Sequence, residues 1–385
     1  MKVIDAVIVE AVRTPIGKKN GLLSRIRAED LAAEPLKELI KRTGIDPALI
    51  DDVIFGCVTQ SGEQGGVIAR QAALIAGYSM EVPGTTIDRQ CGSSQQAVHF
   101  AAQAIISGDM DIVVAGGVES MSRVPMFSNR EGVDYSTKLT EKYDIINQGL
   151  SAEMIVEKWG FSREELDQFS VASHEKAIHA QKNGYFKDEI MPLEVVLTDG
   201  TKQIVMKDEG PRADTTFEIL RELQPVFKEN GTITAGNSSQ MSDGASALLL
   251  MSDKKAAELG LKPRFRIVAR SVIGSDPTIM LTGPIPATEK VLKRAGLSID
   301  EIDVFEVNEA FAPVPLAWLK ETGADSKKLN LNGGAIALGH PLGASGGRLM
   351  ITMMHELERT GGRYGLQTMC EGFGMANATI IERLA

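Results

Sequence analysis

Short apolar runs alternate with helical patterns along most of this chain. Runs with the length of a strand are followed by longer stretches in which apolar side chains recur every three or four positions. In the first half, strand patterns occupy 3–9, 53–58 and 112–115, and helical patterns occupy 31–42 and 91–107. Strands that alternate with helices favour a mainly parallel sheet covered by helices on both faces. We therefore expect an α/β fold.

The two ends of the chain resemble one another, which indicates an internal duplication. Residues 41–44 match residues 293–296, about 252 positions further on. Residues 91–94 and 343–346 each open a helical pattern that ends at a glycine and leads into a strand. Such a spacing suits two copies of one domain rather than a solenoid, and the two α/β layers are expected to pack together. Chance similarity between two α/β segments is the alternative.

A long insertion interrupts the first copy. Residues 119–239 contain amphipathic helical patterns such as 162–183. We predict an N-terminal half formed by 1–118 and 240–260, this insertion domain, and a C-terminal half formed by 261–385. Ligands bind beyond the carboxyl ends of the strands in open α/β sheets. The insertion is therefore expected to cover that site or to bind part of the substrate.

Composition and charge argue against several classes of protein. The chain has 385 residues, of which 43% are hydrophobic and 24% are charged, which is ordinary for a globular protein of two or more domains. A formal net charge of −10 argues against a nucleic-acid binder. No apolar run approaches the roughly 20 residues that span a bilayer, and the start lacks the apolar core of a signal peptide. We expect a cytoplasmic protein without a membrane span.

One histidine stands out because glycines and a proline surround it. The stretch 332–343 holds His340 in a crowded turn just before a helical pattern. The other four histidines fall within helical patterns: His99, His174, His179 and His355. His340 is therefore the candidate for acid–base chemistry.

Three cysteines, Cys57, Cys91 and Cys370, lie too far apart in the chain to suggest a disulfide framework or a metal cluster. Cys57 follows an apolar strand pattern and is expected to be buried and inert. Cys91 is predicted to lie in the first turn of a helix, where free amides and the helix dipole favour a thiolate. A nucleophile paired with a distant histidine is the usual arrangement for covalent catalysis, and a small capping residue is the alternative.

The second half offers two further candidates. Cys370 lies at the end of a strand pattern, before Glu371-Gly372-Phe373-Gly374, where glycines leave amide donors free for an anionic oxygen. Glycine-rich turns after strands are common, so this motif is weak when taken alone. Asn308 precedes a helical pattern, and an asparagine there is usually only a helix cap.

Taken together, these segments resemble the thiolase family over essentially the whole chain. The segment 330–346 reproduces the family's histidine signature and is the most specific match, and 370–376 fits its C-terminal cysteine motif. Phe373 stands where many members have a third glycine, so its bulk is expected to narrow the cleft near the acyl group. Asp88 departs from the small polar residue that is usual three positions before the nucleophile. That departure puts the local geometry in doubt but not the identity of Cys91.

The resemblance implies a fold and an assembly. Duplicated α/β/α domains would form a five-layered α-β-α-β-α arrangement with a helical insertion. Family members pair into homodimers and often join two dimers into a homotetramer through the insertion. The same resemblance implies that acyl-CoA and CoA are the ligands and that CoA is a substrate, with no separate cofactor and no metal.

The resemblance also implies roles for individual residues. Cys91 would be the nucleophile, His340 would take its proton, and Cys370 would protonate the enolate of acetyl-CoA or act as the base in synthesis. The His340 ring and a water held by Asn308 would form one oxyanion site. The backbone amides of Cys91 and Gly372 would form the other, and each such donor typically contributes about 3–4 kcal/mol.

Two further positions match family residues that contact CoA. Arg212 matches an arginine that packs against the adenine, and Ser239 matches a serine near the pantetheine arm. An exposed arginine in an insertion is more often only a solvated charge, so these two assignments rest on the resemblance.

Several functions remain open at this point. A decarboxylating β-ketoacyl synthase would place a second histidine or an asparagine where this chain has a second cysteine. A non-enzymatic lipid or CoA carrier would be expected to lose one of the three reactive residues. Within the enzyme class, Gln148 and its neighbours look more like a degradative 3-ketoacyl-CoA thiolase than a biosynthetic acetoacetyl-CoA thiolase. Gln148 and Phe373 are therefore the candidates for substrate specificity.

Overall fold

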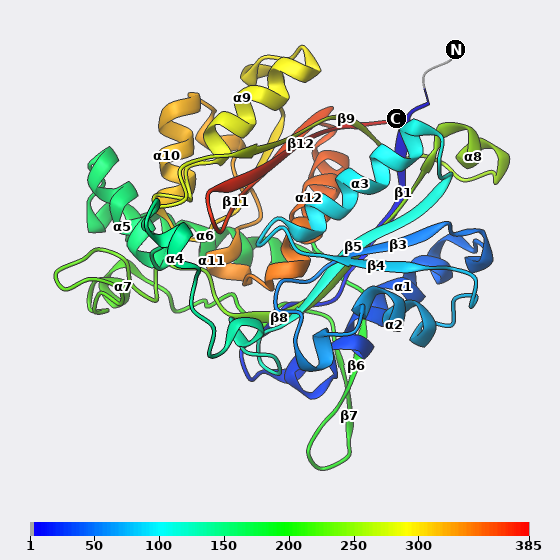
Figure 1. The fold of residues 1–385 in the computed structure, drawn as a ribbon, viewed down its shortest axis with the longest axis horizontal. Helices are drawn as coiled ribbons and strands as arrows, with labels where there is room; N and C mark the ends of the chain where they lie inside the picture. The colour runs from blue at the N-terminus through cyan, green and yellow to red at the C-terminus, as the bar shows by residue number, and fades with distance from the viewer. Residues whose placement is uncertain (1–3, 385) are drawn as a thin grey trace.

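The computed structural model describes residues 4–384, so residue 3 of the first predicted strand and the outermost residues of the predicted domains lie outside it. A ten-stranded sheet dominates this part of the chain, with the strand order β10-β11-β12-β9-β1-β8-β5-β3-β4 and β2 paired to β8 (Figure 1). Its strands are β1 Ala6–Arg13, β2 Gly17–Lys18, β3 Asp52–Gly56, β4 Gly84–Ile87, β5 Ile112–Ser120, β8 Ser242–Ser252, β9 Phe265–Gly274, β10 Val304–Val307, β11 Tyr364–Glu371 and β12 Met375–Arg383. A separate hairpin is formed by β6 Leu193–Val196 and β7 Lys202–Val205.

Helices of very different length connect these strands. They are α1 Ala28–Thr43, α2 Ile68–Ile75, α3 Ser93–Ser107, α4 Thr137–Thr140, α5 Gln148–Trp159, α6 Arg163–Asn183, α7 Phe217–Arg221, α8 Asp253–Glu258, α9 Pro284–Ala295, α10 Pro313–Thr322, α11 Ala335–Leu338 and α12 Leu342–Thr360. Short 3-10 turns lie at Leu22–Arg25, Pro47–Leu49, Gly62–Gln64, Ser128–Arg130, Ile299–Glu301 and Ser326–Lys328. The predicted helix at 162–183 is α6, and the side chain of Ser162 caps its first turn in a capping box.

The sheet is mixed, so the prediction of a mainly parallel sheet was wrong. Only the pairs β3–β4, β3–β5 and β10–β11 are parallel, whereas β8 is antiparallel to both β1 and β5, and β12 is antiparallel to both β9 and β11. Three residues join β11 to β12, and so short a connection permits only an antiparallel pair. The long insertion between β5 and β8 likewise returns the chain in the opposite direction.

Helices and the two halves of the sheet form five layers. Helices α3 and α12 lie in the middle, and one hydrophobic core joins them to β1, β3, β5 and β8 on one side and to β9, β10 and β12 on the other. Helices α1 and α2 cover the outer face of the first half, and α9 and α10 cover the outer face of the second (Figure 1). The halves share one sheet only through a short pairing of β1 with β9. The expected α-β-α-β-α arrangement is confirmed.

The order of elements repeats between the halves, as the internal duplication requires. The first half runs β1-α1-β3-α3-β5-β8 and pairs its strands in the order β3-β5-β8-β1. The second runs β9-α9-β10-α12-β11-β12 and pairs them in the order β10-β11-β12-β9. The turns that precede α3 and α12 therefore occupy equivalent places, and both central helices begin at the same edge of the molecule.

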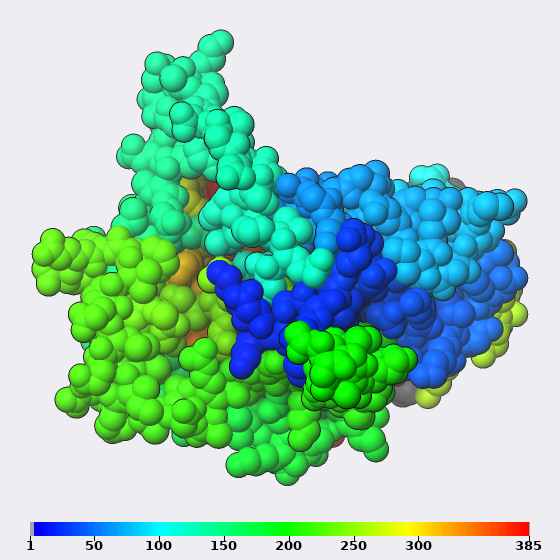
Figure 2. Space-filling model, turned by 90° about the horizontal axis from the view of Figure 1, so that it is seen from below, coloured from blue at the N-terminus to red at the C-terminus, as the bar shows by residue number. Residues whose placement is uncertain are grey.

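The insertion covers one side of this frame. Viewed from below, the segment around 120–145 projects from the body, and the segment around 210–235 forms a separate lobe (Figure 2). Atoms of the C-terminal half are visible at the bottom of the hollow between them (Figure 2). Helix α6 packs against α11, which precedes the His340 turn. No helix within residues 4–384 is both long enough and apolar enough to cross a membrane.

Candidate active site

His340 lies in a tight turn between α11 and α12. Gly339 before it has φ of 103°, and a Cβ at this position would overlap the hydroxyl of Ser242, so only glycine fits without rearrangement. The backbone N–H of His340 donates to the carbonyl oxygen of Gln240 at 3.0 Å, and the side chain is 3% exposed. The structure thus confirms the crowded turn before a helix, although a short helix rather than a strand precedes it.

A chain of hydrogen bonds sets the tautomer of His340. The hydroxyl of Ser345 donates to the carbonyl oxygen of Pro341 at 2.8 Å, so its oxygen is left to accept from Nδ1 of His340 at 2.6 Å. With the proton on Nδ1, the other ring nitrogen carries a lone pair, and the side-chain amide of Asn308 lies 3.3 Å from it. Nε2 of His340 is therefore unprotonated, which is the state in which it can act as a base.

The pKa of His340 keeps this ring neutral. Burial, with a further contribution from the positive charge of Arg348, lowers the pKa to about 3. Arg348 is itself buried and pairs only loosely with Glu306, at 3.7 Å. A neutral imidazole at physiological pH is the state that can accept a proton from a thiol.

Cys91 precedes helix α3 rather than lying within it. The helix begins at Ser93 with Gly92 as its N-cap, so the prediction that Cys91 occupies the first turn was wrong by two residues. Gln90, directly before Cys91, has φ of 49°, which is uncommon for a residue other than glycine. The Cys91 side chain is 6% exposed and packs in an apolar cluster with Leu342, two residues beyond His340.

The thiolate of Cys91 is not favoured in this state. Burial, then the neighbouring Cys370 and then Glu371 raise the pKa of Cys91 well above its usual value, against a lowering contribution from a backbone hydrogen bond. The expectation that the position favours a thiolate was therefore wrong. Within residues 4–384, no hydrogen bond joins the Cys91 thiol to His340, although such contacts often tighten only when substrate binds.

Cys370 and Asn308 meet at the same place. Cys370 is the penultimate residue of β11, as predicted, and is 1% exposed. The Asn308 side chain forms hydrogen bonds with both Cys370 and His340. Burial first and Glu371 next raise the pKa of Cys370 to about 12, against the contribution from Asn308. Helix α10 begins only at Pro313, so the view of Asn308 as a helix cap was wrong.

Sequence reasoning missed the role of Glu371. This carboxyl is fully buried, packs against Gly92, and has no hydrogen-bond partner for either oxygen within the described chain. It lies close enough to Cys91 and Cys370 to influence the pKa of both thiols. Burial raises the pKa of Glu371 itself well above its usual value, which disfavours the carboxylate. An acidic residue directly after a candidate cysteine in a buried strand was the available signal.

An apolar cavity of about 390 Å³ adjoins the cysteines. It brings together three residues singled out from the sequence, Gln148, Gly372 and Phe373. A smaller neighbouring cavity of about 60 Å³ is lined by Cys91, Gln148 and Phe373 among others. These cavities extend from Cys91 into a region that is lined by apolar side chains of the insertion and of the C-terminal half. Such a cavity suits an acyl chain.

Two aromatic residues of this cavity gave no signal in the sequence. Phe127 has φ of 71° and is 59% exposed, and Tyr135 contacts the ring of Phe373 edge-on. Both belong to a part of the insertion without regular periodicity. Their relation to Cys91 therefore depends on the path of a loop, which local sequence patterns do not specify.

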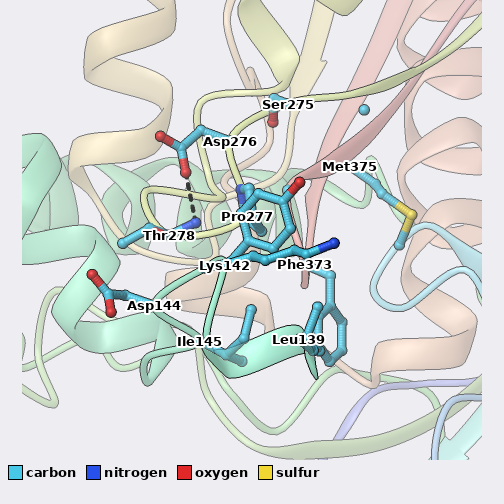
Figure 3. Close-up of a pocket in the computed structure, with 13 residues that line it drawn as sticks. Leu139, Lys142, Asp144, Ile145, Ser275, Asp276, Pro277, Thr278, Phe373 and Met375 are labelled. Atoms are coloured by element: carbon cyan, nitrogen blue, oxygen red, sulfur yellow. Dashed lines mark hydrogen bonds between the residues drawn. The ribbon is translucent and has the colours of Figure 1, made fainter. Parts of the chain in front are cut away.

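A further cavity of about 760 Å³ lies on the other side of Phe373. It is lined by residues of α4 and the following loop, by the loop after β9, and by the hairpin after β11 (Figure 3). Charged side chains, including Lys142, Asp144 and Asp276, stand around it. Phe373 is thus shared by both cavities.

The predicted CoA contacts lie in a different pocket. Arg212 is exposed and lines a cavity of about 220 Å³ together with His174 and Gln240. Its backbone N–H donates to Nδ1 of His174 at 3.1 Å, and burial lowers the pKa of that histidine to about 4. Ser239 adjoins Gln240, and its backbone N–H donates to the carbonyl oxygen of Ala310. Residues 4–384 contain no cluster of three or more side chains placed to hold a metal ion.

Comparison with known proteins finds matches that cover nearly the whole chain. The thiolase N-terminal domain family matches residues 6–254, and the thiolase C-terminal domain family matches residues 261–383. Steroid 3-ketoacyl-CoA thiolase FadA6 of Mycobacterium tuberculosis is 52% identical, covering 99% of this chain and 94% of that protein. A 3-ketoacyl-CoA thiolase of Aliivibrio fischeri is 49% identical, covering 98% of this chain and 99% of that protein.

Solved structures agree with the sequence comparisons. The crystal structure of the Bacillus anthracis acetyl-CoA acetyltransferase matches with a TM-score of 0.92 and 41% identity, covering 99% of each chain. With both domain families matched in order around the two buried cysteines and His340, this chain belongs to the thiolase family.

Proposed function

We propose that this chain catalyses the CoA-dependent thiolytic cleavage of 3-ketoacyl-CoA to acetyl-CoA and a shortened acyl-CoA. The observation that carries the proposal is the convergence of Cys91, Cys370 and a neutral His340 around Asn308, beside an apolar cavity. Relatives at about half identity over the whole chain bear the name 3-ketoacyl-CoA thiolase, which supports the same reaction.

The first step follows from the raised pKa of Cys91. Because the thiol holds its proton, transfer to Nε2 of His340 accompanies attack of the sulfur on the 3-keto carbon. A bond forms between Sγ and that carbon, the carbon–carbon bond breaks, and the electron pair leaves with the acetyl-CoA enolate. Cys370, a thiol with a pKa of about 12, gives its proton to the enolate carbon.

The second step returns the enzyme to its starting state. The thiol of CoA attacks the acyl group on Cys91, and the shortened acyl-CoA leaves as the Cys91 sulfur departs. The proton lost by Cys370 is replaced from the CoA thiol, and His340 returns its proton to Cys91. We further propose that His340 with a water on Asn308, and the amides of Cys91 and Gly372, hold the two negatively charged oxygens.

We propose that CoA enters along the pocket of Arg212. The guanidinium offers a flat cation for the adenine or the phosphates, and Ser239 is next in the chain to Gln240, which lines the same pocket. CoA acts here as a substrate, and the steps above need neither a metal nor a further cofactor. Assembly into a homodimer or homotetramer and a cytoplasmic location are proposed on the family resemblance alone.

A biosynthetic acetoacetyl-CoA thiolase is the second candidate, because the matching Bacillus anthracis structure is named an acetyl-CoA acetyltransferase. The same residues would then run the reaction in reverse. A kcat/KM series over acetoacetyl-CoA and longer 3-ketoacyl-CoAs separates the two. A sharp preference for acetoacetyl-CoA would favour synthesis.

The roles of the two cysteines can be separated by single substitutions. Cys91→Ala should remove the acyl-enzyme seen by intact-protein mass spectrometry and lower thiolysis by at least about 10³-fold, since the nucleophile is gone. Cys370→Ala should still become acylated at Cys91 by acetyl-CoA but should not make or break the carbon–carbon bond. Cys57→Ala, another fully buried cysteine, is the matched control. An acyl adduct that persists in Cys91→Ala, or normal condensation by Cys370→Ala, would refute the assignment.

A further inference from the structure

We propose that Phe373 is a fixed wall between two cavities, and that this wall restricts the enzyme to 3-ketoacyl-CoAs with slender, unbranched tails. The inference rests on the proposed function, because it concerns the acyl group carried by that reaction. Phe373 lines the cavity of about 390 Å³ beside the nucleophile and also the cavity of about 760 Å³ behind it. Ile145 also lines both of these cavities, but among the described residues only Phe373 lines the small cavity at Cys91 as well.

The backbone at Phe373 adopts a conformation that is unfavourable for a residue with a side chain. Its φ is 62°, a left-handed conformation that costs a residue with a Cβ roughly 1–2 kcal/mol and that glycine adopts freely. It stands in the hairpin between Gly372 and Gly374, where a third glycine would remove that cost. Strain of this kind persists where the surrounding structure holds it, and it concentrates at ligand sites.

The same strain recurs around the cavity. Among the seven non-glycine residues with positive φ in the described chain, Gln90, Phe127 and Phe373 all line the cavity of about 390 Å³. Two of these three are phenylalanines, for which a left-handed backbone is a marked outlier. The two phenylalanine side chains that line this cavity therefore lie on strained backbone.

Contacts from the insertion hold the Phe373 ring in place. The Tyr135 ring meets it edge-on, with centroids 5.5 Å apart and planes at 85°. The guanidinium of Arg130 lies 4.3 Å from the centre of the Tyr135 ring. In Figure 3 the Phe373 ring stands beside Leu139 at the edge of the larger cavity. Although Phe373 is 36% exposed, the edge-on contact with Tyr135 holds its ring at the boundary between the two cavities.

The two cavities differ in the tails they would accept. The smaller one is lined by apolar side chains such as Phe227, Met280 and Phe311, which suit a hydrocarbon chain. The larger one carries charged groups such as Lys142 and Asp276, which would suit a bulky ring system with polar substituents. With Phe373 present, a fused-ring tail that starts at Cys91 cannot extend into the larger cavity.

The test compares two substrates in wild type and in variants of the wall. The substrates are 3-ketodecanoyl-CoA and a 3-ketoacyl-CoA with a fused-ring tail, and the readout is the ratio of their kcat/KM values. In Phe373→Ala and Phe373→Gly the ratio should move at least 10-fold toward the fused-ring substrate. Tyr135→Ala, which removes the brace but leaves the wall residue, should move it in the same direction by a smaller factor.

Controls separate the wall from strain relief and from misfolding. Val67→Gly removes a positive-φ side chain (φ of 63°) that lines none of these three cavities and should leave the ratio as in wild type. Acylation of Cys91 by acetyl-CoA, followed by mass spectrometry, reports whether each variant still has a folded site. A ratio that stays within 3-fold of wild type in folded Phe373→Ala and Phe373→Gly would overturn the proposal. So would a wild type that already prefers the fused-ring substrate.

The same measurements distinguish failure of the proposed thiolysis from failure of the proposed wall at Phe373. If wild type cleaves neither substrate and forms no acyl-Cys91, the proposed function is wrong. If wild type cleaves 3-ketodecanoyl-CoA and the variants do not change the ratio, only the wall is wrong.

Discussion

A thiol buried beside a second thiol and a carboxyl does not ionise readily at neutral pH, so Cys91, as the proposed nucleophile, would need a base with an unprotonated nitrogen. His340 meets that need because its proton is held on Nδ1 by Ser345 and its pKa is lowered to about 3. Glu371, when it is charged, raises the pKa of Cys91 and of Cys370 further. Burial is the largest influence on the pKa of each of the three residues, Cys91, His340 and Cys370.

Ser345→Ala tests the tautomer argument. Without the hydroxyl, the proton on Nδ1 loses its acceptor, so the ring can shift its proton to Nε2 and lose its function as a base. Acylation of Cys91 by acetyl-CoA in rapid-mixing experiments should slow by about 10- to 100-fold, and ¹⁵N NMR should show loss of the pure Nδ1–H form. Ser271→Ala removes another buried serine hydroxyl, which donates to Ala287 away from the site, and serves as control. An unchanged acylation rate would contradict the role given to Ser345.

At the scale of elements, polar contacts of the central helices fix the position of the site. Helix α3 is buried yet carries a polar face, on which Gln95 donates to the Thr379 hydroxyl of β12 at 2.7 Å. The hydroxyl of Thr379 can then donate its own proton to Nε2 of His99, which lies 2.7 Å from the hydroxyl oxygen. Such satisfied polar pairs fix the helix against one strand, whereas apolar contacts alone would allow it to slide. They therefore set the position of the turn that carries Cys91.

The buried His99 makes the free energy of unfolding depend on pH, and His99→Gln should reduce this dependence. Burial lowers the pKa of folded His99 to about 3, below the value near 6.5 expected in the unfolded chain. Between these values the unfolded state binds the extra proton, so the free energy of unfolding falls as pH falls through this window. From pH 7 to pH 5 the wild type should lose about 2 kcal/mol more than His99→Gln in urea titrations.

His179→Gln, at an exposed histidine of α6, is the control for that comparison. It should show the pH dependence of the wild type. Equal slopes for wild type and His99→Gln would mean that His99 is protonated in the folded protein or is not the residue responsible.

At the scale of the whole molecule, the two halves meet backbone against backbone. A Cβ added at Gly343 would overlap the carbonyl oxygen of Val118, and one added at Gly117 would overlap the carbonyl oxygen of Gly343. The carboxylate of Glu119 accepts from the backbone N–H of Gly343 at 2.8 Å and from that of Val58 at 3.0 Å. This contact ties the start of α12, and hence His340, to the half that carries Cys91.

Gly343→Ala should loosen that junction. The added methyl group must push the halves apart, which typically costs about 1–3 kcal/mol, and it should displace the His340 turn three residues away. We expect a lower thermal midpoint together with slower acylation of Cys91. Gly274→Ala is the matched control, because a Cβ there meets no atom within 4 Å and the backbone is not left-handed. Full stability and activity in Gly343→Ala would show that the halves are not held by this contact.

The sequence by itself determined the duplicated α/β architecture, because periodicity and turn glycines are local properties of the chain. Its resemblance to the thiolase family also predicted Cys91, His340 and Cys370 as the reactive residues. The tertiary structure alone decided which strands run antiparallel, because direction depends on where the long insertion returns the chain. It also decided that the pKa of Cys91 is raised and that Glu371 influences both cysteines, because a pKa depends on burial and on neighbours distant in sequence. The position of Phe373 between two cavities likewise depends on the tertiary structure, because it requires contact between the insertion loop that carries Tyr135 and the hairpin after β11.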